Sequence, residues 1–337
     1  MYICVVAYKF GTEDEIGSHL GTYHYFIEKM RRVAGQGHQV TVICPWLKFW
    51  RRGSTQVGDV RIDRYWPPLI PHWWLWPLNR LVRKLYSIQT QRVLSRVVAR
   101  HTPDVVYVWQ AREAGYAVSM IKDRLCCPFV FRQITAWKWH FNRSVSEIFK
   151  YARWYQMLSR CGLCAAVDPF LAYLLDNSTQ KKYAAEIYRT ADKVVLLSDA
   201  AVRDAEDFGL DRKKAEVIGV AIEEEVFTPL PHRELLRKEF GFRENNVILF
   251  IGRINFAEKG VGILLEAMAR VIVQVPNSQL VLIGGGRLSA QNCFAKNSAL
   301  PTMSLYSGRN HFQSSQNILM HPIYLPPLRF GWKRSAK

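Results

Sequence analysis

The stretch VILFIGRINFAEKGVGILLEAMARVIVQVPNSQLVLIGGG, which occupies residues 247–286, decides the fold of this chain. Its apolar run 247–251 predicts a β-strand, the amphipathic run 261–275 predicts a helix, and the apolar run 280–283 predicts a second strand. A strand, a helix and a strand in this order form a parallel α/β unit. Glycines follow both predicted strands, at Gly252 and at Gly284, Gly285 and Gly286.

Two cations stand beside the predicted helix start. Arg253 directly follows the strand glycine Gly252, and Lys259 directly precedes Gly260. The amides at the start of a helix and the positive end of its dipole attract anions, and fixed cations strengthen that attraction. The pattern therefore predicts a phosphate or diphosphate site. The alternative is a parallel α/β unit whose glycines only form tight turns and whose cations face solvent.

The string IGRINFAEKG (251–260), with VIGVAIEEEVFTPL (217–230) before it and LVLIGGG after it, resembles the donor half of the family 4 glycosyltransferases. The resemblance runs from about residue 1 to about residue 290. It implies the α/β GT-B architecture, in which two Rossmann-like domains each hold a doubly wound sheet. It also implies that Arg253 and Lys259 hold the diphosphate of a nucleotide-sugar donor, without a metal or another cofactor. The second glycine turn, Gly284 to Gly286, belongs to the same predicted site.

The charge of the chain favours an anionic partner. Lys and Arg number 46 against 28 Asp and Glu, which gives a formal net charge of +18. Nucleic acid, an anionic membrane face and a phosphorylated substrate all fit this balance. The length of 337 residues leaves room for two domains, and 49% of the residues are hydrophobic, which excludes a disordered chain.

The cysteines and the apolar runs indicate the compartment. The seven cysteines are scattered, and the CxxC of Cys161 and Cys164 has no second pair near it, so buried thiols are favoured over disulfides or zinc. No run is long and apolar enough to span a bilayer, and no basic-then-apolar signal peptide begins the chain. We therefore expect a cytoplasmic protein.

The first 200 residues are expected to form the acceptor-side domain. Apolar runs predict its parallel strands at 2–7, 39–44, 104–108, 129–133 and 193–198. By resemblance, Gly21 and Thr22 lie in the cleft loop that approaches the donor and the acceptor. Arg132 and Gln133 stand at a strand end where a catalytic residue of the family would be sought, but no catalytic base is assigned.

Aromatic and basic residues gather in two stretches of this domain, 46–81 and 137–160. Indole rings settle at the headgroup level of bilayers, and neighbouring cations meet anionic lipid. The stretches favour a protein peripheral on the inner membrane face with a lipid-linked or polysaccharide acceptor. In the alternative, the tryptophans of the first stretch lie in the core under a long loop. No nucleic-acid-binding module is recognisable, so nucleic acid is not favoured as a partner.

The segment 292–337 differs in composition from the rest of the chain, because it holds six basic residues and no Asp or Glu. The family continues here with further strand–helix units and with two glutamates, seven residues apart, that hold the sugar and ribose hydroxyls. Neither feature is present. A shifted reading frame or a truncated gene would explain this, and we expect the segment to be poorly ordered and not to pair with the strand 280–283. A genuine basic tail that binds membrane or RNA is the alternative.

The predicted organisation has four parts: an acceptor-side domain (1–200), a connection (201–244), a partial nucleotide-sugar-binding domain (245–291) and an aberrant basic tail (292–337). The resemblance implies transfer of a sugar from a nucleotide sugar to an acceptor hydroxyl. With an incomplete donor domain, this activity is expected to be impaired or absent, so whether the chain is an enzyme stays open. The alternative is a non-catalytic protein of the same fold that binds a membrane or a polyanion.

Overall fold

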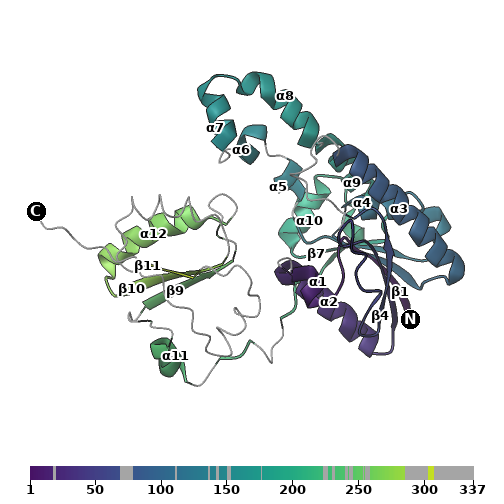
Figure 1. The fold of residues 1–337 in the computed structure, drawn as a ribbon, viewed down its shortest axis with the longest axis horizontal. Coiled ribbons are helices and arrows are strands. Elements are labelled where there is room, and N and C mark those ends of the chain that lie inside the picture. Colours follow the sequence, from purple (N-terminus) through teal and green to yellow (C-terminus); the bar gives the residue numbers. More distant parts are fainter. Residues whose placement is uncertain are drawn as a thin grey trace, which may run out of the picture. The chain divides into compact units, whose positions relative to one another are not determined.

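The computed structural model divides the chain into two compact units, Met1–Ile222 and Glu223–Lys337. The structure describes residues 1–17, 20–68, 79–110, 112–135, 137–141, 144–149, 153–175, 177–222, 227–229, 232–239, 242, 246–252, 254, 259–284 and 303–306. Figure 1 shows that each unit is built around its own sheet.

The first unit is built around an eight-stranded sheet with the order β3-β4-β2-β1-β5-β6-β7-β8. Every neighbouring pair is parallel except β3 and β4, which form an antiparallel edge. The strands are β1 (Tyr2–Val6), β2 (Gln39–Pro45), β3 (Gln56–Val57), β4 (Val60–Tyr65), β5 (Val105–Trp109), β6 (Phe129–Arg132), β7 (Lys193–Leu196) and β8 (Ala215–Val217). The five strands predicted from apolar runs are confirmed, and β3, β4 and β8 are additional.

The helices of the first unit lie on both faces of its sheet, except for three that stand apart from it. They are α1 (Glu13–Ile16), α2 (Leu20–Gly35), α3 (Asn79–Arg100), α4 (Arg112–Ser119), α5 (Trp137–Phe141), α6 (Val145–Phe149), α7 (Arg153–Arg160), α8 (Cys164–Leu175), α9 (Asn177–Thr190) and α10 (Asp199–Glu206). Two short 3₁₀ helices lie at Lys122–Arg124 and Arg212–Lys214. The chain leaves β1 toward β2 and β4 on one side and returns to β5 on the other, so the topological switch point lies between β1 and β5.

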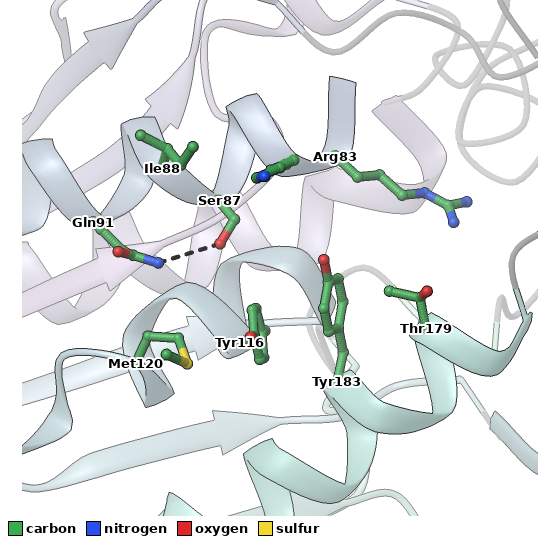
Figure 2. A pocket seen from close by; sticks show the side chains of 9 residues that line it. Arg83, Ser87, Ile88, Gln91, Tyr116, Met120, Thr179 and Tyr183 are labelled. Atoms are coloured by element: carbon green, nitrogen blue, oxygen red, sulfur yellow. Dashed lines mark hydrogen bonds between the residues drawn. The ribbon is translucent and has the colours of Figure 1, made fainter. Parts of the chain in front are cut away.

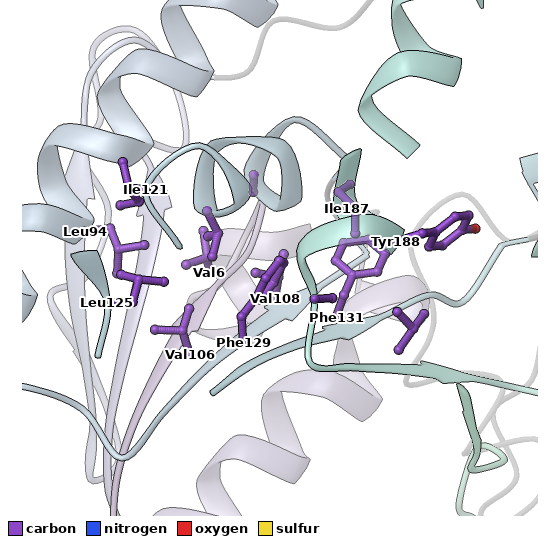
Figure 3. Packing of buried hydrophobic residues seen from close by; sticks show 14 of the residues in the cluster. Val6, Leu94, Val106, Val108, Ile121, Leu125, Phe129, Phe131, Ile187 and Tyr188 are labelled. Carbon is purple, nitrogen blue, oxygen red and sulfur yellow. The ribbon is translucent and has the colours of Figure 1, made fainter. Parts of the chain in front are cut away.

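One face of this sheet forms the largest hydrophobic core. One cluster of buried side chains contains Val108, Phe129 and Phe131 of β5 and β6 with Leu94 of α3 and Ile187 of α9, and Figure 3 shows Phe131 beside Ile187. All five side chains are fully buried. Burying side chains of this size stabilises a fold by about 1.5–3 kcal/mol each, so this layer fixes the positions of the strand ends.

The opposite face of the sheet packs against α2 through aromatic rings. Phe26 of α2 stacks on Trp109 of β5 with ring centroids 4.4 Å apart, and Phe10 meets Phe26 edge-on at 5.5 Å. Because the three rings are almost fully buried, they hold α2 against the carboxyl end of β5.

A second, smaller core lies within α6, α7 and α8, where Val145, Tyr155 and Leu171 are buried together. Figure 1 shows these helices standing apart from the sheet of the first unit. The hydroxyl of Tyr155 donates to Asp168 at 2.8 Å, which ties α7 to α8. We call this element the α6–α8 projection.

The second unit confirms the strand–helix–strand prediction. It contains β9 (Asn246–Ile251), α12 (Val261–Gln274) and β10 (Ser278–Ile283), preceded by α11 (Arg233–Glu239). β9 and β10 are parallel, and their inner side chains pack on α12 in a core that includes Leu265, Met268 and Leu280. On the other face, Leu249 and Ile251 of β9 are half exposed, as expected for strands left partly uncovered.

One prediction about the basic tail is wrong. Met303–Tyr306 forms β11, which pairs in parallel with β10 in the register Leu280↔Met303 to Ile283↔Tyr306. This pairing contradicts the prediction that no residue of 292–337 pairs with the strand 280–283. An open edge of β10 presents unpaired amides and carbonyls, and a short extended segment satisfies them whatever its charge. The rest of 292–337 lies outside the described residues.

Candidate functional site

The two glycine turns of the second unit come together at the carboxyl ends of β9 and β10. The amide of Gly252 donates to the carbonyl of Ile283 at 2.9 Å. A Cβ atom at Gly284 would overlap the carbonyl oxygen of Gly252, and φ is positive at both glycines, +153° at Gly284 and +156° at Gly252. Glycine is therefore required at 284 for the two strand ends to approach. Gly284 therefore has a structural role in the turn, and the phosphate site stays a prediction.

The start of α12 carries the second half of the predicted diphosphate site. Gly260 is the N-cap residue, in the left-handed conformation with φ 63°, and it has no side chain to accept from the first helical amides. Its carbonyl accepts from the amide of Leu264 at 3.0 Å, which begins the helical ladder. Lys259 stands exposed immediately before it. A 14-residue helix that begins in this way offers its amides and its dipole to an anion.

The structure leaves part of this site without a description. Arg253, Gly285 and Gly286 lie outside the described residues, so their roles stay predictions. Gly252 and Gly284 are brought together, and Lys259 and Gly260 open α12.

In the first unit the expected ligand crevice lies at the β1/β5 switch point. Ligands of open α/β sheets bind beyond the carboxyl ends of the strands where the strand order reverses. Gly21 and Thr22 lie in the first turn of α2, so the chain there is helical and not an open glycine loop as expected. Gln110, which directly follows β5, has φ +55°, and its amide donates to the carbonyl of Arg132 at 2.8 Å. Residues other than glycine that adopt the left-handed backbone conformation are uncommon and are often found at functional sites.

The loop after β1 is held by a buried ion pair. The carboxylate of Glu15 accepts from the amide and hydroxyl of Ser54, at 2.8 and 2.9 Å, and from the amide of Thr12 at 3.1 Å. The guanidinium of Arg64 lies 4.0 Å away and donates to the carbonyl of Phe10 at 2.6 Å. Burial alone would raise the pKa of Glu15, but hydrogen bonds from Ser54 and Thr12 and the charge of Arg64 outweigh it and lower the pKa. Glu15 is thus a carboxylate that fixes this loop.

The two polar residues that end β6 have different surroundings. The side-chain oxygen of Gln133 accepts from the hydroxyl of Tyr188 at 2.6 Å, and its nitrogen donates to the carbonyl of Thr135 at 3.1 Å. Gln133 is therefore engaged within the fold. Arg132 is 1% exposed, and its Nη2 donates to the carbonyl of Gly219 at 3.0 Å. Neither group is a base at neutral pH, so no catalytic base is assigned.

The expectation that 137–160 meets a membrane as one stretch is wrong for Trp137. Its ring is almost fully buried against Phe131 and Tyr188, at 5.5 and 5.4 Å, because it completes the core beside β6. The guanidinium of Arg112, which is partly buried, lies 5.8 Å from the centre of the same ring. Trp154, further along the stretch, exposes 44% of its surface, so this ring does face solvent.

The first aromatic stretch is likewise divided. Trp50 and Trp66 are exposed, at 82% and 51%, whereas Trp46 is partly buried. Trp73, Trp74 and Trp76 lie outside the described residues. Between Trp50 and Trp66, β4 forms a regular strand beside β2, so the stretch 46–81 is not one long loop.

A pocket of about 360 Å³ opens in the helical layer of the first unit. Figure 2 shows that α3 supplies Arg83, Ser87 and Gln91, while α4 and α9 supply Tyr116 and Tyr183. The two tyrosine rings stack on each other with centroids 4.1 Å apart, so each ring has one face covered by the other. None of the site residues expected from the sequence lines this pocket.

Two further features bear on the sequence expectations. Cys161 and Cys164 are free thiols, and across the described ranges no three His, Cys, Asp or Glu side chains gather as metal ligands would. Within the same ranges, no helix combines the length and apolar character needed to cross a bilayer.

Comparison with known proteins defines the fold. The sucrose-phosphate synthase of Thermosynechococcus elongatus matches 94% of this chain and 72% of its own length, with a TM-score of 0.60 and 13% identity. The Anabaena protein HepE in complex with UDP and glucose matches 95% of this chain and 71% of its own, with a TM-score of 0.57 and 13% identity. The lipopolysaccharide outer core galactosyltransferase WaaB gives 95% and 71%, a TM-score of 0.55 and 14% identity. No family model and no curated protein matches.

These structures share the GT-B fold, so the predicted fold class is confirmed. At 13–14% identity the likeness establishes the fold alone.

Proposed function

We propose that this chain binds a nucleoside diphosphate sugar in its second unit and acts as a glycosyltransferase, passing the sugar to an acceptor hydroxyl. The observation that carries the proposal is the joint placement of the Gly252 turn, Lys259 and the uncapped start of α12 in a chain of GT-B fold. A neighbour of the same fold, HepE, has been crystallised with UDP-glucose.

The chemistry suits such a site. As the glycosidic bond of the donor breaks, negative charge grows on the departing diphosphate. Cations and helix amides aimed at those oxygens stabilise the transition state more than the ground state, which lowers the barrier. Lys259 would supply one charge, and Arg253 would supply a bidentate fork that a lysine cannot reproduce. No metal is needed in this arrangement.

The proposed transfer is weak or absent in this chain. Residues 267–337 contain no Asp or Glu, so this stretch offers no carboxylate to the sugar and ribose hydroxyls. The resemblance places two glutamates there. A panel of nucleotide sugars incubated with the protein tests the proposal, with release of nucleoside diphosphate as the readout. Release of nucleoside diphosphate above the uncatalysed rate with one donor supports sugar transfer or hydrolysis. If no donor gives release, the protein at most binds a nucleotide sugar without transferring the sugar.

A second candidate is the non-catalytic one, in which the protein lies on the inner face of an anionic membrane. The observation that favours it is the surface of the α6–α8 projection. There, Trp154, Met157, Leu163 and Phe170 expose between 44% and 66% of their surface, beside the exposed Arg160. Exposed rings and apolar chains enter the headgroup region, and cations add about 1 kcal/mol each against anionic lipid. The same surface would serve a cytoplasmic transferase whose acceptor is lipid-linked.

A further inference from the structure

Two polar groups buried in the first unit lie on the same face of the sheet without hydrogen-bond partners. In the described part of the chain, Nε of Arg132 and the hydroxyl of Tyr107 are both buried and unpaired. Trp109 pairs with Arg132 between β5 and β6, which makes Tyr107 and Arg132 diagonal neighbours. Long side chains at diagonal positions reach one another across a parallel pair. Unpaired buried donors are costly, so their presence calls for an explanation.

A second cation reaches the same place from α2. The Nζ of Lys29 lies 5.8 Å from the ring centre of Tyr107, and Lys29 is half-buried. Burial and then the charge of Arg132 lower the pKa of Lys29. The charge of Arg132 also opposes the rise that burial causes in the pKa of Tyr107. Lys29 from α2 and Arg132 from the neighbouring strand therefore both lie beside Tyr107.

In the part of the chain that the structure describes, no carboxylate balances these two cations. Among the described residues, neither Arg132 nor Lys29 makes an ion pair with a carboxylate, and Arg132 spends one bond on the carbonyl of Gly219. Two like charges held close together in a buried place are unfavourable unless an anion binds beside them. Their place on the sheet is the β5/β6 side of the switch point, where Gln110 has its left-handed backbone.

We infer that Lys29, Tyr107 and Arg132 form an anion site that takes the phosphate group of a phosphorylated acceptor. Lys29 supplies a point charge, Arg132 supplies its free Nε–H, and Tyr107 supplies a hydroxyl donor, which together match the oxygens of a phosphomonoester. A carboxylate has only two oxygens to meet these three donors. The inference rests on the proposed function in that it assigns the phosphate to an acceptor.

The test titrates inorganic phosphate, and then glycerol 3-phosphate, into the full chain carrying Lys259→Ala, which weakens the proposed donor site. We expect one binding event. Tyr107→Phe, Lys29→Met and Arg132→Gln should each weaken it about tenfold or more, as loss of a charge-assisted bond does. Arg96→Ala, which removes an exposed charge from α3, should leave it unchanged.

Tyr107→Phe keeps the test decisive even if Arg132→Gln fails to fold. It deletes only an unpaired hydroxyl, so thermal unfolding should show a fold at least as stable as the parent. Phosphate affinity that is equal in the parent, Tyr107→Phe and Lys29→Met, or no phosphate binding at all, overturns the inference.

The source of the phosphate is resolved by a second arm with vesicles of phosphatidylcholine that carry phosphatidic acid. Binding to these vesicles that depends on Tyr107 assigns a lipid phosphate, and Tyr107-dependent binding of glycerol 3-phosphate alone assigns a soluble acceptor. UDP binding is measured separately on the chain with Lys259 intact. If the chain binds phosphate but not UDP, the proposed donor function is removed and the anion site remains. If the chain binds UDP but not phosphate, the anion site alone is removed.

Discussion

Gly284 and Gly252 lie so close that any side chain at 284 would overlap the carbonyl oxygen of Gly252. The two residues end neighbouring parallel strands, and the amide of Gly252 is bonded to the carbonyl just before Gly284. The contact holds β9 and β10 in line at the edge where the donor diphosphate is proposed to bind. The glycine turn therefore has a structural role that any binding role must share.

Gly284→Ala should destabilise the second unit by more than about 2 kcal/mol, because the backbone must shift and φ is +153°. Amide exchange of β9 and β10 measures the effect within this unit. Gly260→Ala is the matched control, since it shares positive φ but meets nothing within 4 Å. It should cost only about 1–2 kcal/mol. Equal losses in the two variants would show that the close approach is not real.

Glu15→Gln should destabilise the first unit by about 1–3 kcal/mol at neutral pH, because it keeps the shape of a 5%-exposed side chain and removes its charge beside Arg64. The pKa of Glu15 is lowered in the fold, so its contribution is present above the unfolded pKa of about 4.3. It is lost as the pH falls through the lower folded pKa.

Urea unfolding at pH 7 and at pH 3 measures this effect. The difference in free energy of unfolding between the parent and Glu15→Gln should shrink at the lower pH. Glu28→Gln on the exposed face of α2 is the control. It pairs with Arg31 and Arg32 at the surface, where such pairs contribute about 0–1 kcal/mol. A gap for Glu15→Gln that does not change with pH would contradict the assignment.

Trp154→Ser combined with Phe170→Ser should weaken binding to anionic vesicles by about tenfold or more, because each exposed side chain buries its apolar surface on insertion. Vesicle flotation checks this, and binding should fall as salt rises. Met120→Ser removes a similarly exposed apolar side chain directly after α4 and should leave vesicle binding unchanged. Equal binding to neutral and anionic vesicles would remove the membrane proposal.

The sequence was sufficient for the α/β class and for the strands that carry long apolar runs. The strands at 247–251 and 280–283 could be predicted because each is an unbroken run of apolar residues between glycine and polar residues. β4 was missed because Arg61, Asp63 and Arg64 interrupt its apolar pattern. The burial of Arg64 depends on tertiary partners, which are the carboxylate of Glu15 and backbone carbonyls such as that of Phe10. β11 was missed because its pairing depends on the open edge of β10 and not on its own composition.

The candidate site could be predicted only in its local part. Gly252, Lys259 and Gly260 are neighbours in the sequence, so their spacing carries the signal. Lys29, Tyr107 and Arg132 come from α2, β5 and β6, and only the strand register and the cover of α2 bring them together. The one signal available beforehand was Arg132, a charge at the end of the apolar strand FVFR.

The most direct test of the central claim is calorimetric titration of UDP into the full chain. We expect saturable binding that weakens about tenfold or more in Lys259→Ala, because a charge-assisted bond is worth roughly 1.5–3 kcal/mol. Arg253→Ala should behave similarly, and Arg253→Lys should also lose affinity because the bidentate fork is gone. Arg270→Ala, which removes an exposed charge from the far end of α12, should bind as the parent does. Unchanged UDP affinity in a chain that lacks both Arg253 and Lys259, or no binding by the parent, would contradict the account.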